Sequence, residues 1–271
     1  MPPALFHCAR QLNVRDLSII IPTCNRAQLL DRCLTTLARN VACDYEIIVV
    51  DGASTDRTPD VLERACDLFE DRLTWIREPR RQGFVKAANT GFREAKGEYL
   101  TWLNDDARPL PDSYDNAIKQ LERRSVQAGL VAMYHRWNSP RNIAYEKAAG
   151  GTTYQLCHVR GTLYANFAIA HREVFHQLDY FDEQYRFYGA DPDFSLKAWH
   201  AGLKVEPAIA SFIDHDQVED GRRFTDAEQG RRDNARLFEK WDLPPVNPHR
   251  NDFDPRHPCT LGNYRRRNPA A

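Results

Sequence analysis

Short apolar runs alternate with amphipathic stretches along the first hundred residues. The runs predict four β-strands, at Leu17–Ile21, Glu46–Val50, Leu73–Arg77 and Glu98–Leu103. The stretches between them carry apolar residues at helical spacing and predict helices over residues 26–40, 57–70 and 84–95. Strands that alternate with helices through short links form a mostly parallel sheet with right-handed crossovers and helices on both faces. The pattern therefore predicts an α/β fold.

The pattern becomes less regular in the second half of the chain. It predicts strands at 128–134 and 204–213, an extended segment at 159–170, and helices at 171–178, 191–201 and 225–240. Residues 136–158 are rich in Asn, Gly and Thr and predict a loop or a hairpin. Because no repeat and no linker between separate cores is found, we expect an N-terminal extension (1–15), one domain (16–242) and a tail containing Pro and Arg (243–271).

Composition excludes several classes of protein. With 42% hydrophobic and 28% charged residues, the 271-residue chain can bury a full core. Its 37 basic and 38 acidic residues give a net charge of −1, so we expect no nucleic-acid partner. The apolar runs are far shorter than the roughly 20 residues of a membrane helix. The N-terminus lacks a secretory pattern, so we expect neither a transmembrane segment nor export.

The cysteines and histidines do not form a known metal or redox motif. Seven cysteines are scattered without a CxxC pair, which argues against a disulfide framework or a structural zinc site. No HExxH, GxxxxGK(S/T) or GxGxxG motif is present. We therefore expect reduced thiols in a cytoplasmic protein. The Arg265–Arg267 run either contacts an anionic surface, such as the inner face of a membrane, or is a solvated end.

Polar residues follow three of the predicted strands. In an open parallel sheet, ligands bind outside the carboxyl ends of the strands. We therefore expect these side chains to converge on one edge: Thr23, Asn25 and Arg26; Asp51, Ser54 and Asp56; Asn104, Asp105 and Asp106. The last trio has two interpretations. Adjacent carboxylates suit a divalent cation bound together with substrate phosphates, but Asp-rich turns before proline are also common.

Three further candidates lie in the second half of the chain. Asp191, before Pro192, is either the N-cap of a helix or a general base directed at a bound substrate. His215 follows the last predicted strand and is either a metal ligand or a structural histidine. Trp137 is a candidate for stacking on a sugar, whereas Trp75, Trp102 and Trp199 lie in periodic segments and are expected in the core.

Four segments in order resemble the family 2 glycosyltransferases, which have the GT-A fold. They are LSIIIPTCNR, YEIIVVDGASTDRT, RQGFVKAANTGFREAKGEYLTWLNDD and YFDEQYRFYGADPDFSLKAWHAG, and together they extend from about residue 16 to residue 216. The resemblance implies a Rossmann-like, mostly parallel sheet with helices on both faces. It also implies one domain with a nucleotide-sugar-binding half (16–107) and an acceptor-binding half (108–242).

The resemblance also implies an activity and a set of site residues. The activity is transfer of a sugar, with inversion, from a UDP-, dTDP- or GDP-sugar to an acceptor hydroxyl in polysaccharide, glycolipid or glycoconjugate synthesis. Asp191 matches the catalytic base, and Asp106, in the DxD element, matches the ligand of Mn²⁺ or Mg²⁺. His215, from its place after the last predicted strand, is the candidate for a further ligand. The nucleotide-sugar site would comprise Pro22, Thr23, Asn25, Arg26, Asp51, Ser54, Gly83, Lys86, Asn89, Asn104 and Asp105.

These roles are chemically consistent. A divalent cation stabilises the charge that develops on the departing diphosphate, and a single carboxylate suffices to take the proton of the attacking hydroxyl. The acceptor would be a saccharide, a lipid-linked molecule or another hydroxyl compound. Two other classes of protein are alternatives to a glycosyltransferase. A sugar-1-phosphate nucleotidyltransferase lacks its Gly-rich phosphate loop here, and a non-catalytic nucleotide-sugar-binding or scaffolding protein is suggested by Ala190, where the family commonly has Glu.

Overall fold

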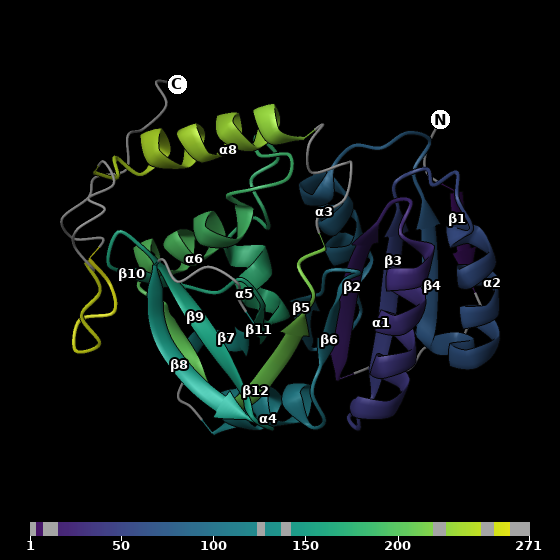
Figure 1. Cartoon of the computed structure of the whole chain (residues 1–271), viewed down its shortest axis with the longest axis horizontal. Coiled ribbons are helices and arrows are strands. Elements are labelled where there is room, and N and C mark those ends of the chain that lie inside the picture. The colour runs from purple at the N-terminus through teal and green to yellow at the C-terminus, as the bar shows by residue number, and fades with distance from the viewer. Residues whose placement is uncertain are drawn as a thin grey trace.

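In the parallel part of the central sheet the strand order reverses between β2 and β5, and this reversal positions the candidate site. The computed structural model describes residues 4–7, 16–123, 128–136, 142–218, 226–244 and 252–260. Within these ranges the sheet has twelve strands, nine of them in the order β1-β4-β3-β2-β5-β11-β7-β12-β6 (Figure 1). The other three, β8, β9 and β10, join it through β7.

The first half of the domain is a parallel α/β unit. Its elements are β2 (Leu17–Thr23), α1 (Ala27–Asn40), β3 (Tyr45–Asp51), α2 (Thr58–Phe69), β4 (Leu73–Arg77), α3 (Phe84–Glu94) and β5 (Tyr99–Trp102). The strands β4, β3, β2 and β5 are parallel neighbours in that order. The chain moves outward from β2 to β4 and then returns to the other side of β2. Right-handed crossovers therefore place α1 and α2 on one face and α3 on the opposite face. The reversal between β2 and β5 is where such sheets bind ligands.

The second half extends the sheet with mixed pairing. Its elements are β6 (Ala107–Pro109), α4 (Ser113–Glu122), β7 (Ala128–His135), β8 (Ile143–Ala149), β9 (Thr152–Val159), β10 (Thr162–Tyr164), β11 (Ala168–His171), α5 (Arg172–Gln177), α6 (Ala190–His200), β12 (Lys204–His215) and α8 (Ala227–Lys240). Here only β7 and β12 pair in parallel, whereas β11 is antiparallel to both of its neighbours, β5 and β7. Parallel pairing therefore predominates only in the first half.

Most predicted elements are confirmed within one or two residues, and the differences have physical reasons. Residues 136–158 contain the β8–β9 hairpin, whose turn places Gly150 and Gly151 at positive φ of 55° and 79°, which glycine adopts without strain. Strand β2 continues through Pro22 to Thr23 because its pairing with β5 stops at Ile20, so the proline lies where one edge is open. The sequence analysis missed β6 and α4.

Parts of the N-terminal extension and of the C-terminal tail also form hydrogen bonds with the domain. Strand β1 (Ala4–His7), from the extension, pairs antiparallel with β4 at the end of the sheet. From the tail, the Pro258 carbonyl accepts a hydrogen bond of 2.8 Å from the Leu163 backbone N–H. No helix in the described ranges is long and apolar enough to cross a bilayer. The Arg265–Arg267 run and Trp137 lie outside the described residues.

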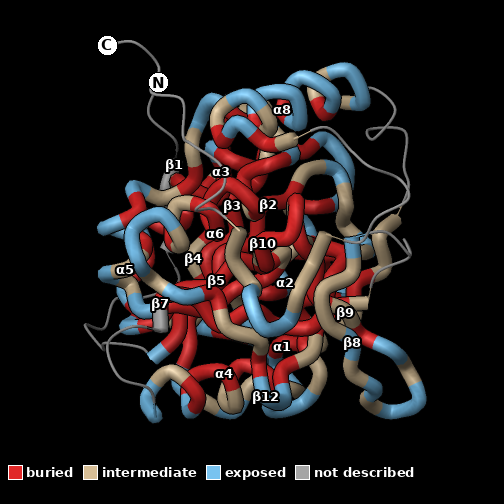
Figure 2. Tube along the Cα trace, turned by 90° about the vertical axis from the view of Figure 1, so that its left-hand side faces the viewer, coloured by how far each residue is buried: buried red, intermediate tan, exposed pale blue. Residues whose placement is uncertain are grey.

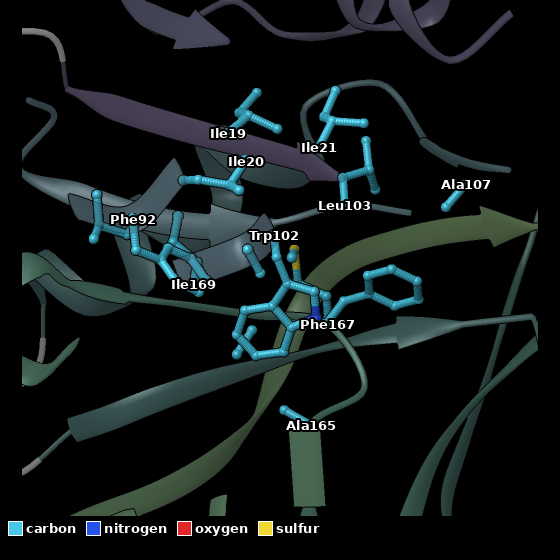
Figure 3. Packing of buried hydrophobic residues seen from close by; sticks show 14 of the residues in the cluster. Ile19, Ile20, Ile21, Phe92, Trp102, Leu103, Ala107, Ala165, Phe167 and Ile169 are labelled. Atoms are coloured by element: carbon cyan, nitrogen blue, oxygen red, sulfur yellow. The ribbon is translucent and has the colours of Figure 1, made fainter. Parts of the chain in front are cut away.

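Buried apolar side chains of both halves form one core cluster, and Figure 2 shows the buried residues at the centre of the backbone trace. Ile19, Ile20 and Ile21 of β2 are fully buried, and Trp102 of β5 is 1% exposed. Trp102 Nε1 donates a hydrogen bond of 2.9 Å to the carbonyl of Asn166, in the loop between β10 and β11 that also carries Phe167 (Figure 3). The two halves therefore share their packing at the strand pair that borders the reversal.

Gly97 precedes β5 and allows this packing to be tested at the end of the strands opposite the candidate site. A Cβ at Gly97 would lie 2.6 Å from the Ser18 backbone nitrogen, and backbone cannot move aside as a side chain can. We expect Gly97→Ala to lower the free energy of unfolding by about 2 kcal/mol, measured by urea denaturation. Glu94→Ala, at an exposed position nearby, should change it by less than about 0.5 kcal/mol. Equal stability of the two variants would contradict the packing described.

Candidate active site

A pocket of about 330 Å³ opens at the carboxyl ends of β2 and β5, beside the reversal in strand order. Both halves of the domain contribute to its walls. The predicted site residues that line it are Pro22, Thr23, Arg26, Gly83, Asn104, Asp105, Asp106, Asp191 and His215. Of the nine polar residues expected to converge at one edge, five line the pocket: Thr23, Arg26, Asn104, Asp105 and Asp106.

Two buried carboxylates follow β5 and share one arginine. Arg26 Nη1 lies 2.9 Å from Asp105 Oδ1 and 3.2 Å from Asp106 Oδ2. The Thr23 hydroxyl donates a hydrogen bond of 2.8 Å to Asp105 Oδ2. Burial raises the pKa of Asp105 to about 6 although Arg26 opposes the shift. Arg26 is therefore the main compensation for negative charge at this point of the fold.

Asp106 and His215 form a pair suited to a divalent cation. His215 Nε2 lies 3.2 Å from Asp106 Oδ1, and the other oxygen, Oδ2, is occupied by Arg26 and by the Val218 backbone N–H. Burial alone would raise the pKa of Asp106, but the adjacent His215 imidazole and the charge of Arg26 lower it to about 2. A carboxylate that stays ionised beside an imidazole nitrogen fits a Mn²⁺ or Mg²⁺ site.

The protein supplies only part of a coordination shell there. Among the described residues, no group of three or more His, Cys, Asp or Glu side chains is arranged to hold a metal. Asn104 contributes an amide that lies 3.4 Å from His215 Nε2. The remaining ligands would have to come from water or from a bound diphosphate, which is how Mg²⁺ sites on phosphate substrates are usually completed.

Asp191 lines the same pocket as these acids, and its role as a helix cap is not observed. Helix α6 begins at Ala190, after Gly189 at φ 79°, so Asp191 lies inside the first turn and its side chain makes no cap. Asn166 Nδ2 donates a hydrogen bond of 2.8 Å to Asp191 Oδ2. Burial raises the pKa of Asp191 to about 7. The carboxylate is therefore poised to accept a proton near neutral pH, which suits a general base.

Asp51 is close to the pocket but does not line it. Its Oδ1 accepts a hydrogen bond of 3.0 Å from the Ser54 N–H, whereas the buried Oδ2 has no hydrogen-bond partner and lies 3.8 Å from Arg77 Nε. An unsatisfied buried carboxylate oxygen is costly unless a ligand donates to it. The next residue, Gly52, lines the pocket. Asp51 is thus suited to receive an N–H from a ligand.

The other predicted nucleotide-site residues have different surroundings. Asn25 Oδ1 accepts hydrogen bonds from the backbone of the 54–56 loop, and Ser54 Oγ accepts one from the Asn25 N–H, so the pair joins two loops below the pocket. Asn89 is buried and bonds to the backbone of Phe181 in both directions. Lys86 is exposed and does not line the pocket. Asn25, Ser54 and Asn89 therefore support the backbone around the pocket, whereas Lys86 does not.

Several lining residues were missed by the sequence analysis. They are Glu78, Arg81, Asn166, Phe167, Phe187, Tyr188 and Asp226. Arg81 forms an ion pair of 2.7 Å with Asp226, which links the first half to the start of α8. Asn166 follows a short extended segment, so the rule applied to the first strands could have found it. Trp102 also lines the pocket although it is almost wholly buried, as expected for a core residue.

The shared arginine gives a prediction about stability. At pH 8, Arg26→Ala should lower the free energy of unfolding by about 3 kcal/mol in urea denaturation, because it leaves adjacent buried carboxylates uncompensated. Adding Asp105→Asn should recover part of that loss. Arg32→Ala, at a position that is 58% exposed, should have little effect. Purely additive losses in the double variant would contradict a coupled triad.

Comparisons with known proteins identify the family of the chain. The family model described as "Glycosyl transferase family 2" matches residues 18–179, more than half of the chain. A "PGL/p-HBAD biosynthesis glycosyltransferase" of Mycobacterium bovis is 40% identical over 89 residues, 33% of this chain and 34% of the relative. The "Validoxylamine A glucosyltransferase" of Streptomyces hygroscopicus subsp. jinggangensis is 42% identical over 109 residues, 38% of this chain and 24% of the relative. The chain thus spans about a third or less of these relatives.

Solved structures support the fold. A mannosyltransferase from Pyrobaculum calidifontis, in complex with GDP-Man and Mn²⁺, aligns with a TM-score of 0.64 at 24% identity, covering 86% of this chain and 67% of that one. GalNAc-T7 with UDP, GalNAc and Mn²⁺ aligns with a TM-score of 0.66 at 16% identity, covering 84% and 49%. The expected GT-A fold is confirmed. With the matching family model and the order of its motifs, the chain belongs to glycosyl transferase family 2.

Proposed function

We propose that this protein is an inverting glycosyltransferase that moves a sugar from a nucleotide-diphosphate donor to the hydroxyl of an acceptor. One observation carries the proposal above all. The same pocket contains an ionised carboxylate beside an imidazole and, on another wall, a carboxylate whose pKa is about 7. Carboxyl groups with pKa values driven apart by their surroundings have separate chemical roles.

The first half (16–107) would bind the donor. Asp51 Oδ2 would accept an N–H of the base, since it is buried and lacks a hydrogen-bond partner. Pro22, Thr23 and Arg26 would border the nucleotide, with Gly83, Asn104 and Asp105 completing the wall. The neighbouring structures hold GDP-Man or UDP, so the donor would be a UDP-, dTDP- or GDP-sugar.

Asp106 and His215 would hold a divalent cation, Mn²⁺ or Mg²⁺. When bound, the cation would neutralise charge that develops on the leaving diphosphate. Two protein ligands and an incomplete shell suit a cation completed by the donor. Both neighbouring structures contain Mn²⁺, which supports this choice.

Asp191 would take the proton of the acceptor hydroxyl as the oxygen attacks the sugar. Asn166 would hold the carboxylate in place through its 2.8 Å hydrogen bond. One base on the attacking side is enough for direct displacement, and direct displacement inverts the configuration of the anomeric carbon. The acceptor would be a saccharide, a lipid-linked molecule or another hydroxyl compound bound by the second half (108–242). We propose polysaccharide, glycolipid or glycoconjugate synthesis in the cytoplasm, with peripheral contact to a membrane, as the setting.

Asp191 makes the pH dependence testable. The base must be deprotonated, so kcat/KM should fall about tenfold per pH unit below the pKa of about 7 and level off above it. Asp191→Asn should lower turnover by about 10²- to 10⁴-fold, measured as release of nucleoside diphosphate from a panel of nucleotide sugars.

The same variant serves as its own folding control. Because folding raises the pKa of Asp191, ionisation above about pH 7 opposes folding, so Asp191→Asn should be at least as stable as wild type at pH 8. Undiminished turnover in this variant would reject Asp191 as the base. A wild-type protein that binds nucleotide without any turnover would be a binding protein instead.

The metal assignment has an independent readout. With UDP or GDP present, Asp106→Asn and His215→Ala should each weaken Mn²⁺ binding by at least about tenfold in electron paramagnetic resonance titrations. Asp60→Asn, at a position that is 57% exposed, should leave it unchanged. Chelation should stop transfer and added Mn²⁺ or Mg²⁺ should restore it. Wild-type affinity in both site variants would refute this metal site.

A further inference from the structure

Tyr188 places an exposed aromatic ring at the pocket, three residues before Asp191. Tyr188 is 39% exposed, and it lines the same pocket as Asp191 and Asn166. The other large apolar residues exposed in the described part of the chain are Leu68 and Ile209, which do not line it. Ligand pockets are lined mainly by apolar and aromatic side chains, and a tyrosine offers a ligand both an apolar face and a polar hydroxyl.

Helix α8 holds the backbone of Tyr188 in place. Asp233, which is 1% exposed, receives the backbone N–H groups of three consecutive residues on its carboxylate. The donor–acceptor distances to Asp233 Oδ2 are 3.2 Å for Arg186, 2.9 Å for Phe187 and 3.1 Å for Tyr188. Hydrogen bonds to an ionised acceptor are stronger than neutral ones, so the loop is tied firmly to α8.

The same helix also supports the ring. Gly230 lies one turn before Asp233, and a Cβ there would be 2.9 Å from Cδ2 and Cε2 of Tyr188. The ring therefore rests on the helix backbone where only glycine leaves room. Figure 1 shows α8 lying over α6, the helix that begins next to Asp191.

The helix is anchored at both ends. Near its start, Asp226 pairs with Arg81 at 2.7 Å. At its end, Lys240 Nζ lies 2.8 Å from Asp193, and Trp241 Nε1 donates a hydrogen bond of 2.7 Å to the same carboxylate. Asp193 belongs to α6 and is fully buried. A shift of α8 would take Lys240 and Trp241 away from this carboxylate and leave a buried charge uncompensated, which is costly. Tyr188 is thus a preorganised surface.

The neighbouring ring is not available in the same way. The Phe187 ring has the Arg81 guanidinium at 4.7 Å and the Arg186 guanidinium at 5.2 Å from its centroid. Both cations therefore contact that ring. Of the other aromatic residues that line the pocket, Trp102 and Phe167 are buried and Phe84 is partly buried, so Tyr188 is the exposed one among them.

We propose that Tyr188 is the platform on which a pyranose ring of the acceptor stacks, with Asp233 and Gly230 as positioning residues. The inference rests on the proposed transfer reaction and adds the class of acceptor. A pyranose has an apolar C–H face and hydroxyls at its edge. The apolar face matches the exposed ring, and Asn166, Asp191 and Gln217 on the pocket wall provide polar partners for the hydroxyls.

Saturation-transfer NMR on the full chain with diamagnetic Mg²⁺ and UDP or GDP tests the platform. The probes are methyl β-D-glucopyranoside and methyl α-D-mannopyranoside, with sorbitol as an acyclic polyol and benzyl alcohol as an aryl compound. We expect a pyranoside to bind wild type and sorbitol not to bind. Tyr188→Ala should weaken pyranoside binding about tenfold, whereas Tyr188→Phe and Tyr188→Trp should retain it. Asp233→Asn should weaken it too, because its amide cannot accept three N–H groups as well.

The controls separate this inference from the transferase proposal. Leu68→Ala removes an exposed apolar side chain elsewhere and should change nothing. Calorimetry with UDP and GDP should give the same nucleotide affinity in every variant. Unchanged pyranoside binding in Tyr188→Ala, weaker nucleotide binding in that variant, or wild-type binding of benzyl alcohol alone would each overturn the platform. Pyranoside binding that needs Tyr188 in a protein without turnover would uphold the platform and overturn the transferase proposal.

Discussion

Two adjacent carboxylates are buried where β5 ends, and the first half of the protein is organised around that negative charge. Asp105 and Asp106 are 5% and 2% exposed. Arg26, from the start of α1, reaches both of them, and Thr23 at the end of β2 donates to one. These partners come together because β2 and β5 are neighbours with their carboxyl ends at one edge. A parallel sheet that reverses its order at this strand pair is therefore a condition for the site.

The second half surrounds the same pocket with groups of a different character. His215 comes from the end of β12, where the aspartates on either side of it pair with Arg108 and Arg136. Asp191 lies at the start of α6 with an amide, and no described cation, as its partner. Charge compensation and His215 lower the pKa of Asp106 to about 2, whereas burial raises that of Asp191 to about 7. One pocket thus holds a permanent anion and a proton acceptor.

Helix α8 connects this chemistry to the packing of the domain. Asp193 is buried two residues after Asp191, and it is bonded by Lys240 and Trp241 from the end of α8. Asp233 and Gly230 on the same helix determine the path of the loop that leads into α6. A predominantly charged helix with only a few buried residues therefore fixes one wall of the pocket through specific polar contacts.

Local pattern alone determined the strands and helices of the first half and the residues that follow each strand. Periodicity depends on neighbouring residues, so Thr23, Arg26 and Asp106 could be placed at one edge before any contact was known. Helix α4 was missed although Tyr114, Ala117, Ile118 and Leu121 have helical spacing, so that signal was present in the sequence. Tertiary structure alone decided that Asn89 supports Phe181, that Asn166 reaches Asp191, and that Tyr188 rests on Gly230. Asn89 and Phe181 are 92 residues apart in the sequence, and Asn166 and Asp191 are 25 apart. Tyr188 lies in a loop, and Gly230 lies in a separate helix. Packing in three dimensions sets such pairings, and no local periodicity encodes them.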